Sequence, residues 1–130
     1  MNAALVAVDR RDYDWAFRFG NGSSLTIESL WRLVSTEAIV LTSQDDGQQF
    51  GVNTTIDAAS ELMAKLAGQR VADVSVDRVT SDLTISFSDG LRLQVLSTSS
   101  GFEAWDLSAE GIEIIGRNGD RVFFPQAQKE

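Results

Sequence analysis

The side chains of this 130-residue chain that could do chemistry are mostly carboxylates. The sequence has no His and no Cys, which excludes the commonest general base, thiolate nucleophiles and disulfides. Two carboxylates can still perform acid–base work, as in glycoside hydrolysis, where they lie within reach of each other. The sequence places no two of them together, and we expect no enzyme. The candidates for such a pair are Glu28, Glu37, Glu103, Asp45 and Asp46.

Asp45 and Asp46 lie in a segment rich in oxygen donors. Hard cations such as calcium and magnesium take several oxygen ligands. The spacing of a calcium-binding loop is not met, because the positions before Gly47 that should be acidic hold Gln44 and Thr42. We therefore predict no metal site and no cofactor, and we retain the two aspartates as candidate binding residues.

The segment 98–105 brings two aromatic residues and a carboxylate close together in the sequence. Phe102, Glu103 and Trp105 follow a run of Ser and Thr, and exposed aromatic residues are energetically favoured at protein interfaces. We take these three as candidate binding residues. The alternative for Trp105 is a place in the core, because Trp31 stands at the equivalent point of an internal repeat.

The net charge of −8, from 19 acidic and 11 basic residues, bears on the choice of partner. It disfavours nucleic acid and anionic membranes, because no Lys/Arg cluster is present to release counterions. It suits a basic protein partner, although net charge also serves solubility alone. The sequence shows neither a signal peptide nor an apolar stretch of about 20 residues, so we expect a cytoplasmic protein with no membrane contact.

An internal repeat organises the elements that must position these residues. Residues 4–29 align without a gap onto residues 72–97, with ten identities in 26 positions, and after six extra residues Trp31 aligns with Trp105. Short alternating stretches separated by tight-turn signals such as Gly20-Asn21-Gly22 predict antiparallel hairpins. In the first copy we expect strands over 4–8, 15–19, 25–34 and 38–42. In the second copy we expect strands over 71–79, 83–87, 91–96, 104–107, 112–115 and 121–124, ended by Pro125.

One helix is expected between the two copies. Thr54 and Asp57 have the spacing of a capping box, and Gly68 stands where a left-handed cap ends a helix. An apolar stripe runs between them at helical spacing and would face the core: Ala59, Leu62, Met63, Leu66 and Ala67. We expect this helix to lie across the sheet or sheets.

Several short stretches carry a resemblance to a known family. Residues 101–107 (Gly-Phe-Glu-Ala-Trp-Asp-Leu), 46–51 (Asp-Gly-Gln-Gln-Phe-Gly) and 31–33 (Trp-Arg-Leu) resemble an uncharacterised family of small bacterial proteins of unknown function. Some similar small acidic proteins are suspected to be immunity proteins that act on secreted toxins. The resemblance implies a binding role and assigns no catalytic residue.

The sequence thus predicts an α+β fold with two similar antiparallel β-meanders, an internal duplication, and one amphipathic helix packed on the sheet. We expect a single domain over 1–130, with repeat 1 over about 4–50, a helix-containing connector over 51–71, repeat 2 over about 72–124 and a tail over 125–130. The function expected is a non-enzymatic protein-binding module, in the form of an immunity-type inhibitor of a bacterial toxin. One alternative is a small-ligand binder or hydrolase-like enzyme with a carboxylate pocket between the repeats, lined by Glu28, Arg32 or Asp45. Another is a self-associating domain, such as a homodimer.

Overall fold

In the part of the chain that the structure describes, the fold is mostly β, with one α-helix. The computed structural model describes residues 2–51, 53–117, 119 and 122–125, the last four by their backbone alone. Within them the strands are β1 (Leu5–Arg10), β2 (Trp15–Phe19), β3 (Ser24–Ile27), β4 (Leu30–Val34), β5 (Ile39–Thr42), β6 (Val71–Val76), β7 (Leu83–Phe87), β8 (Arg92–Leu96), β9 (Trp105–Ala109), β10 (Ile112–Gly116) and β11 (Val122–Pro125). A 3₁₀ turn, η1 (Ser43–Asp45), and the helix α1 (Ala58–Lys65) lie between β5 and β6.

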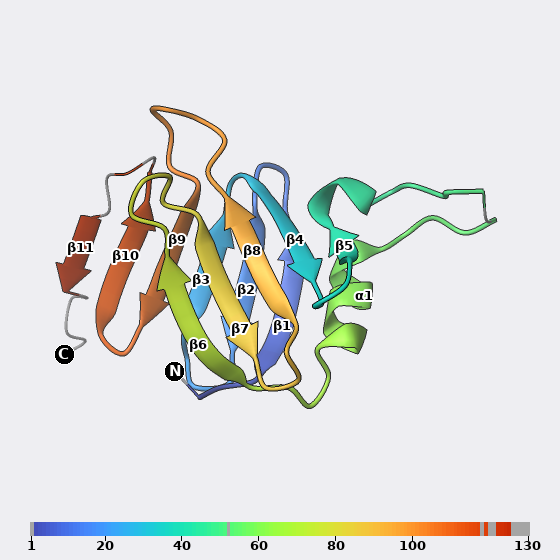
Figure 1. Ribbon diagram of the computed structural model, residues 1–130, viewed down its shortest axis with the longest axis horizontal. Coiled ribbons are helices and arrows are strands. Elements are labelled where there is room, and N and C mark those ends of the chain that lie inside the picture. Colours follow the sequence, from blue (N-terminus) through green and yellow to red (C-terminus); the bar gives the residue numbers. More distant parts are fainter. Residues whose placement is uncertain (1, 52, 118, 120–121, 126–130) are drawn as a thin grey trace.

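The strands form two antiparallel sheets that face each other (Figure 1). One sheet has the order β1-β2-β3-β9-β10-β11, and the other has the order β5-β4-β8-β7-β6. The first three strands of each repeat form the expected meander, but the next strands leave it for the opposite sheet. The predicted long strand over 25–34 is therefore wrong: it breaks at Glu28 and Ser29, where the chain crosses between sheets.

The two crossings are reciprocal in register. Strand β4 of the first repeat pairs with β8 of the second, with Trp31 opposite Val95. Strand β9 of the second repeat pairs with β3 of the first, with Trp105 opposite Ile27. These are the pairs that the sequence alignment makes equivalent. Each repeat thus contributes strands to the sheet of the other. The predicted fold, with a separate meander in each copy, does not include this exchange.

The hairpins differ in length between the repeats. Four residues connect β1 to β2 and six connect β6 to β7, because Arg10 pairs with Trp15 whereas Val76 pairs with Leu83. The structural equivalence of β1 with β6 is therefore displaced by two residues from the gapless alignment. The Gly22 and Gly90 turns do correspond, with φ angles of +86° and +92°, and each lets its hairpin close tightly.

The core lies between the sheets and is built from the alternating inward side chains of both. Strand β2 shows the pattern, since Trp15, Phe17 and Phe19 are buried whereas Arg18 is exposed. Trp31 from the opposite sheet meets the Trp15 ring edge-to-face, with 5.1 Å between ring centroids. Such edge-to-face packing adds to the gain from burial.

The helix lies beside the edge strands β1 and β5 (Figure 1). Its buried residues, Ala58 and Leu62, join the core cluster together with Leu66, the C-cap residue that follows it. Its N-cap is Asp57, which accepts a hydrogen bond from Ser60 N at 3.2 Å, and not Thr54 as the capping-box spacing predicts. Gly68 has a φ of +77°, as expected for a residue that follows a helix end.

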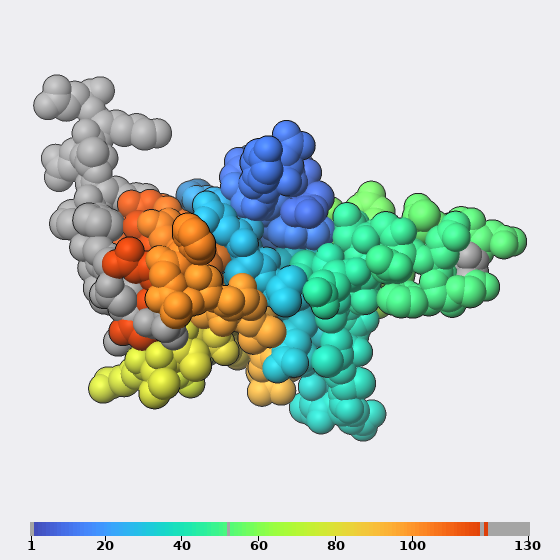
Figure 2. Space-filling model, turned by 90° about the horizontal axis from the view of Figure 1, so that it is seen from above, coloured from blue at the N-terminus to red at the C-terminus, as the bar shows by residue number. Residues whose placement is uncertain are grey.

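An arm formed by residues 47–51 and 53–56 projects from the body between η1 and α1 (Figures 1 and 2). Two backbone hydrogen bonds of 2.8 Å, Gly47 N to Ile56 O and Ile56 N to Gln48 O, close its base.

At the C-terminal end, β11 includes Pro125, which an edge strand tolerates. The predicted tail over 126–130 lies outside the described residues. Among those residues, none of the helices has the length and apolar character that crossing a bilayer requires.

Candidate functional site

The two sheet crossings lie at one end of the sandwich, together with the β1–β2 loop and η1. Figure 2 looks onto this end, where residues near 10–14, 28–31, 43–47 and 97–104 share one face. The first crossing is the dipeptide Glu28-Ser29, and the second is the longer segment 97–104. The second copy is therefore the longer one at this crossing.

Hydrogen bonds fasten the two crossings to each other. Glu28 N donates to Ala104 O at 2.9 Å, and Ser29 Oγ donates to the same carbonyl at 3.3 Å. Within the longer crossing, Gly101 N and Phe102 N both donate to Ser99 Oγ at 3.1 Å. The backbone beneath Phe102 and Glu28 is therefore held in place, although both side chains remain exposed.

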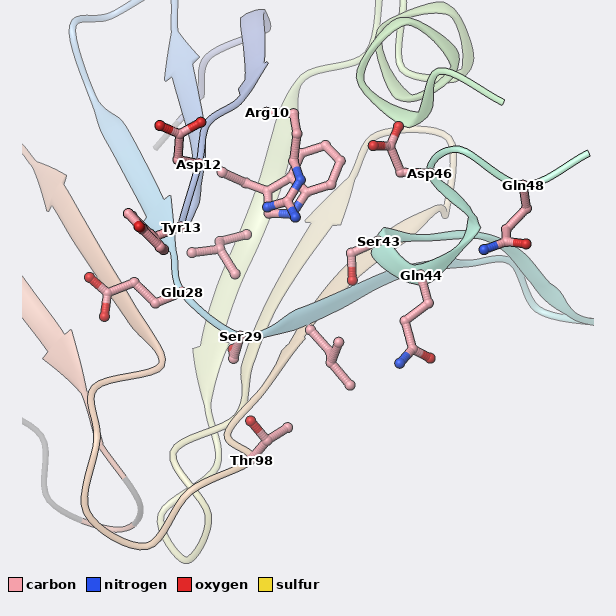
Figure 3. A pocket seen from close by; sticks show the side chains of 13 residues that line it. Arg10, Asp12, Tyr13, Glu28, Ser29, Ser43, Gln44, Asp46, Gln48 and Thr98 are labelled. Atoms are coloured by element: carbon pink, nitrogen blue, oxygen red, sulfur yellow. The ribbon is translucent and has the colours of Figure 1, made fainter. Parts of the chain in front are cut away.

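A cleft of about 680 Å³ opens between the β1–β2 loop, the first crossing and η1. Figure 3 shows Asp12, Tyr13 and Glu28 on one side of it and Ser43, Gln44 and Asp46 on the other, with Arg10 between them. Polar residues of three loops thus line one open space.

A second cleft of about 420 Å³ adjoins the first. Its walls add Phe102, Glu103 and Ser99, and it shares four residues with the larger cleft: Tyr13, Glu28, Ser29 and Thr98. We call the two clefts together the crossover groove. Two aromatic rings stand at its rim, because Tyr13 is 92% exposed and Phe102 is 81% exposed.

The charge of the crossover groove is negative. Four carboxylates line it, namely Asp12, Glu28, Asp46 and Glu103, whereas Arg10 is its only cationic residue among those described.

Two neighbouring arginines beside the larger cleft, Arg10 and Arg11, are engaged within the chain. The Arg10 guanidinium lies 4.9 Å above the centre of the Trp15 ring, a cation–π contact. Next to it, Arg11 Nη2 donates to Asp14 Oδ2 at 2.7 Å. The hydrogen bonds from Arg11 lower the pKa of Asp14 below its ordinary value. The groove therefore presents carboxylates to solvent while its nearby cations are held by intramolecular contacts.

The predicted binding residues divide into two groups. Phe102 and Glu103 lie together on one wall of the groove, and Asp46 lies on the opposite wall of the larger cleft. Asp46 also has a structural task, because its Oδ1 accepts a hydrogen bond from Ala58 N at 2.9 Å, at the start of α1. Asp45 lines none of the described clefts, and its Oδ2 accepts a hydrogen bond from Thr42 N at 2.9 Å.

Trp105 lies in the core and does not reach the groove surface. It is 1% exposed, its Nε1 donates to Ser81 O at 2.7 Å, and its indole packs against Gly116. A Cβ at Gly116 would lie 2.0 Å from Trp105 Cε2, so this contact depends on glycine. The equivalence with Trp31 in the repeat is the sequence signal for this core position.

Asp106 carries the largest electrostatic perturbation at this end. Burial, followed by a hydrogen bond with the Glu113 carboxyl and the negative charges of Glu113, Glu103 and Glu28, raises its pKa from 3.8 to about 7. Its Oδ1 is buried and accepts no hydrogen bond from another residue. Asp106 lines a small cavity of about 80 Å³ behind the groove.

Sequence reasoning missed Tyr13 and Asp106. Tyr13 lies in the polar four-residue turn between β1 and β2, where a single aromatic residue is a signal for an exposed ring. Asp106 alternates with the buried residues Trp105 and Leu107 on β9, and only the pairing of β9 with β10 brings Glu113 near it. In the part of the chain that the structure describes, no group of three acidic residues is arranged to hold a metal ion.

The fold and this site define a two-sheet β-protein with an open acidic groove at its sheet crossings. A family model matches residues 8–117, and the chain belongs to this family, the family of unknown function DUF6188. The match covers the strands from β2 to β10 and every residue of the crossover groove. Comparison with curated proteins and with solved structures finds no match.

Proposed function

We propose that this protein is a non-enzymatic binding module and that the crossover groove receives a basic segment of a protein partner. The observation that carries the proposal is the pairing, in one groove, of the exposed rings of Tyr13 and Phe102 with the carboxylates of Glu28 and Glu103. Exposed aromatic residues supply large contact area at protein interfaces, and complementary charge steers association with a basic partner.

The form of partner that the resemblance implies is a bacterial toxin that the protein neutralises as an immunity-type inhibitor in the cytoplasm. Nucleases and other enzymes that act on polyanions carry basic surfaces, which an acidic groove would cover. The net charge of −8 supports the same choice of partner. In this proposal Phe102 and Glu103 are binding residues, Asp46 supports α1 from the far wall, and Trp105 holds the second crossing in place from the core.

An affinity capture from a lysate of the source organism tests the proposal. The immobilised wild-type protein is compared with the double variant Phe102→Ala, Glu103→Lys, and with the control Glu37→Lys, which makes the same charge change at an exposed site outside the groove. We expect a partner that is retained by the wild type and the control and lost by the double variant. Equal retention by all three proteins would place the interface elsewhere.

The larger cleft also supports a second candidate function, that of a small-ligand binder or hydrolase-like enzyme. Its volume of about 680 Å³ lies within the range of small-molecule pockets. Of the residues proposed to line such a pocket, Glu28 does line it. Arg32 lies outside it, and its Nε donates to Gln94 Oε1 at 2.6 Å. Binding of small molecules by a variant that no longer captures a protein would favour this candidate.

We also infer that the chain arose by internal duplication. The support is the reciprocal pairing of β4 with β8 and of β9 with β3, in which equivalent residues occupy equivalent registers. A self-associating domain, in which a free sheet edge pairs with a second copy, is the remaining alternative. Sedimentation as a single species of about 14 kDa over a wide concentration range would exclude it.

A further inference from the structure

We propose that the recognition element of the crossover groove is an arginine side chain of the partner, seated between Tyr13 and Phe102 against Glu28 and Glu103. This inference rests on the proposed function and names the chemistry that the groove selects. All four residues line the same cleft of about 420 Å³, and we call this place the arginine seat. One ligand group in the seat could therefore contact aromatic faces and carboxylates together. A planar guanidinium stacks on aromatic rings and binds carboxylates at the same time, which a Lys ammonium does less well.

The chain already holds one guanidinium against an aromatic ring next to the arginine seat. Arg10 lies 4.9 Å above the Trp15 ring, and both residues line the adjoining larger cleft. The partner's arginine would repeat this contact one loop away. Because Arg10 is a cation at the groove, it also repels the incoming guanidinium, and its removal should strengthen binding.

The seat is built to stay open. Phe102 is held at the rim by the hydrogen bonds that Gly101 N and Phe102 N donate to Ser99 Oγ, so its ring remains 81% exposed without collapsing into the core. Glu28 is placed by the bond from its own amide to Ala104 O. A site whose backbone is fixed in advance loses little conformational entropy on binding.

The occupant is a peptide segment and not a free cation. The seat opens directly into the larger cleft of about 680 Å³, which offers room for the residues that flank the arginine. Ser29 and Thr98, which line both clefts, place hydroxyl groups along this path, where a peptide backbone could bond to them.

The test is an NMR titration of the isotope-labelled protein with a blocked peptide, Gly-Ser-Arg-Ser-Gly. The matched probe carries citrulline in place of arginine, which has nearly the same shape without the charge. We expect the arginine peptide to shift the amide signals of Tyr13, Ser29 and Phe102, and the citrulline peptide to bind at least about fivefold more weakly.

Variants of the protein complete the test. Glu28→Gln and Glu103→Gln should each weaken the arginine peptide by about two- to fivefold, and Tyr13→Ala should do so by a similar factor. Arg10→Ala should tighten binding. Glu37→Gln, at an exposed site away from the groove, should leave the affinity unchanged.

Three results would overturn the inference. These are equal binding of the citrulline and arginine peptides, no shift at millimolar peptide, and binding of argininamide alone as tightly as the peptide. The last would identify a small-ligand site. If the peptides fail while the Phe102→Ala, Glu103→Lys variant still loses a captured partner, the arginine seat is refuted and the protein-binding function stands.

Discussion

Replacing Asp106 by Asn should stabilise the protein at pH 8 and have no such effect near pH 4. Asp106 has a pKa raised from 3.8 to about 7 in the folded protein, chiefly by burial and then by the Glu113 carboxyl on the neighbouring strand. Well below its ordinary pKa of 3.8 the carboxyl is protonated in both the folded and the unfolded chain. Between pH 4 and pH 7 the unfolded chain is ionised while the folded protein keeps the proton. The free energy of unfolding therefore falls as the pH rises through this window and levels off above about pH 7.

The size of the effect follows from the pKa and from the exposure of the side chain. Each pKa unit corresponds to about 1.4 kcal/mol, so full burial would give at most about 4 kcal/mol. Asp106 has one buried oxygen, but the side chain as a whole is only half-buried, and solvent screens its charge. We therefore expect a gain of about 1–2 kcal/mol for Asp106→Asn at pH 8. For a chain of 130 residues this raises Tm by about 4–7 °C.

The assay is thermal unfolding followed by circular dichroism at pH 4 and pH 8. The control is Asp73→Asn, which removes the same charge from an exposed position on β6 and so reports the effect of net charge alone. The difference in Tm between Asp106→Asn and this control is the quantity of interest. An equal gain at both pH values, or a loss at pH 8, would refute the assignment of Asp106 as a destabilising buried carboxylate.

Three further substitutions test the packing that supports the groove. Gly116→Ala places a methyl group against the Trp105 indole and should lower the free energy of unfolding by at least about 2 kcal/mol. The control Gly101→Ala, where the added methyl group meets open space, should leave stability unchanged. Equal effects of the two substitutions in denaturant melts would contradict the packing of Trp105 on Gly116. Asp46→Ala removes the acceptor for the first amide of α1 and should lower stability by about 1 kcal/mol, with faster hydrogen exchange confined to the start of the helix. Leu62→Ala, at a fully buried position, should cost about 3 kcal/mol, and a loss below 1 kcal/mol would mean that α1 is not docked on the core.

Local sequence signals were sufficient for the hairpins and the inward faces. Alternation predicts β2 and β7 with their observed bounds. The turns at Gly22 and Gly90 predict the β2–β3 and β7–β8 hairpins. Both are local properties, set by side-chain period and by backbone conformation. The α+β class and the presence of one helix between β5 and β6 followed from the same signals. The expected position of the helix across the sheets did not follow, because α1 lies beside the edge strands β1 and β5.

The crossings between the sheets could not be read in the same way. Glu28 and Ser29 continue the alternation of β3 into β4, so periodicity alone favours one long strand. The break is a tertiary effect, because Glu28 N and Ser29 Oγ bond to Ala104 O, 76 and 75 residues away. The groove exists only because of this crossing, and its far wall comes from η1. Phe102 and Glu103 were therefore predictable as surface residues, whereas Tyr13 and Glu28 could not be placed beside them.

Hydrogen–deuterium exchange, measured on the free protein and on its complex with a captured partner, tests the central claim most directly. We predict that protection on binding concentrates in residues 12–13, 28–29 and 97–104, which line the crossover groove, and that β6 and the outer part of the arm, residues 49–51 and 53–55, exchange at unchanged rates. Protection of this outer part or of β6, with none at the two crossings, would contradict the claim that the groove is the binding surface.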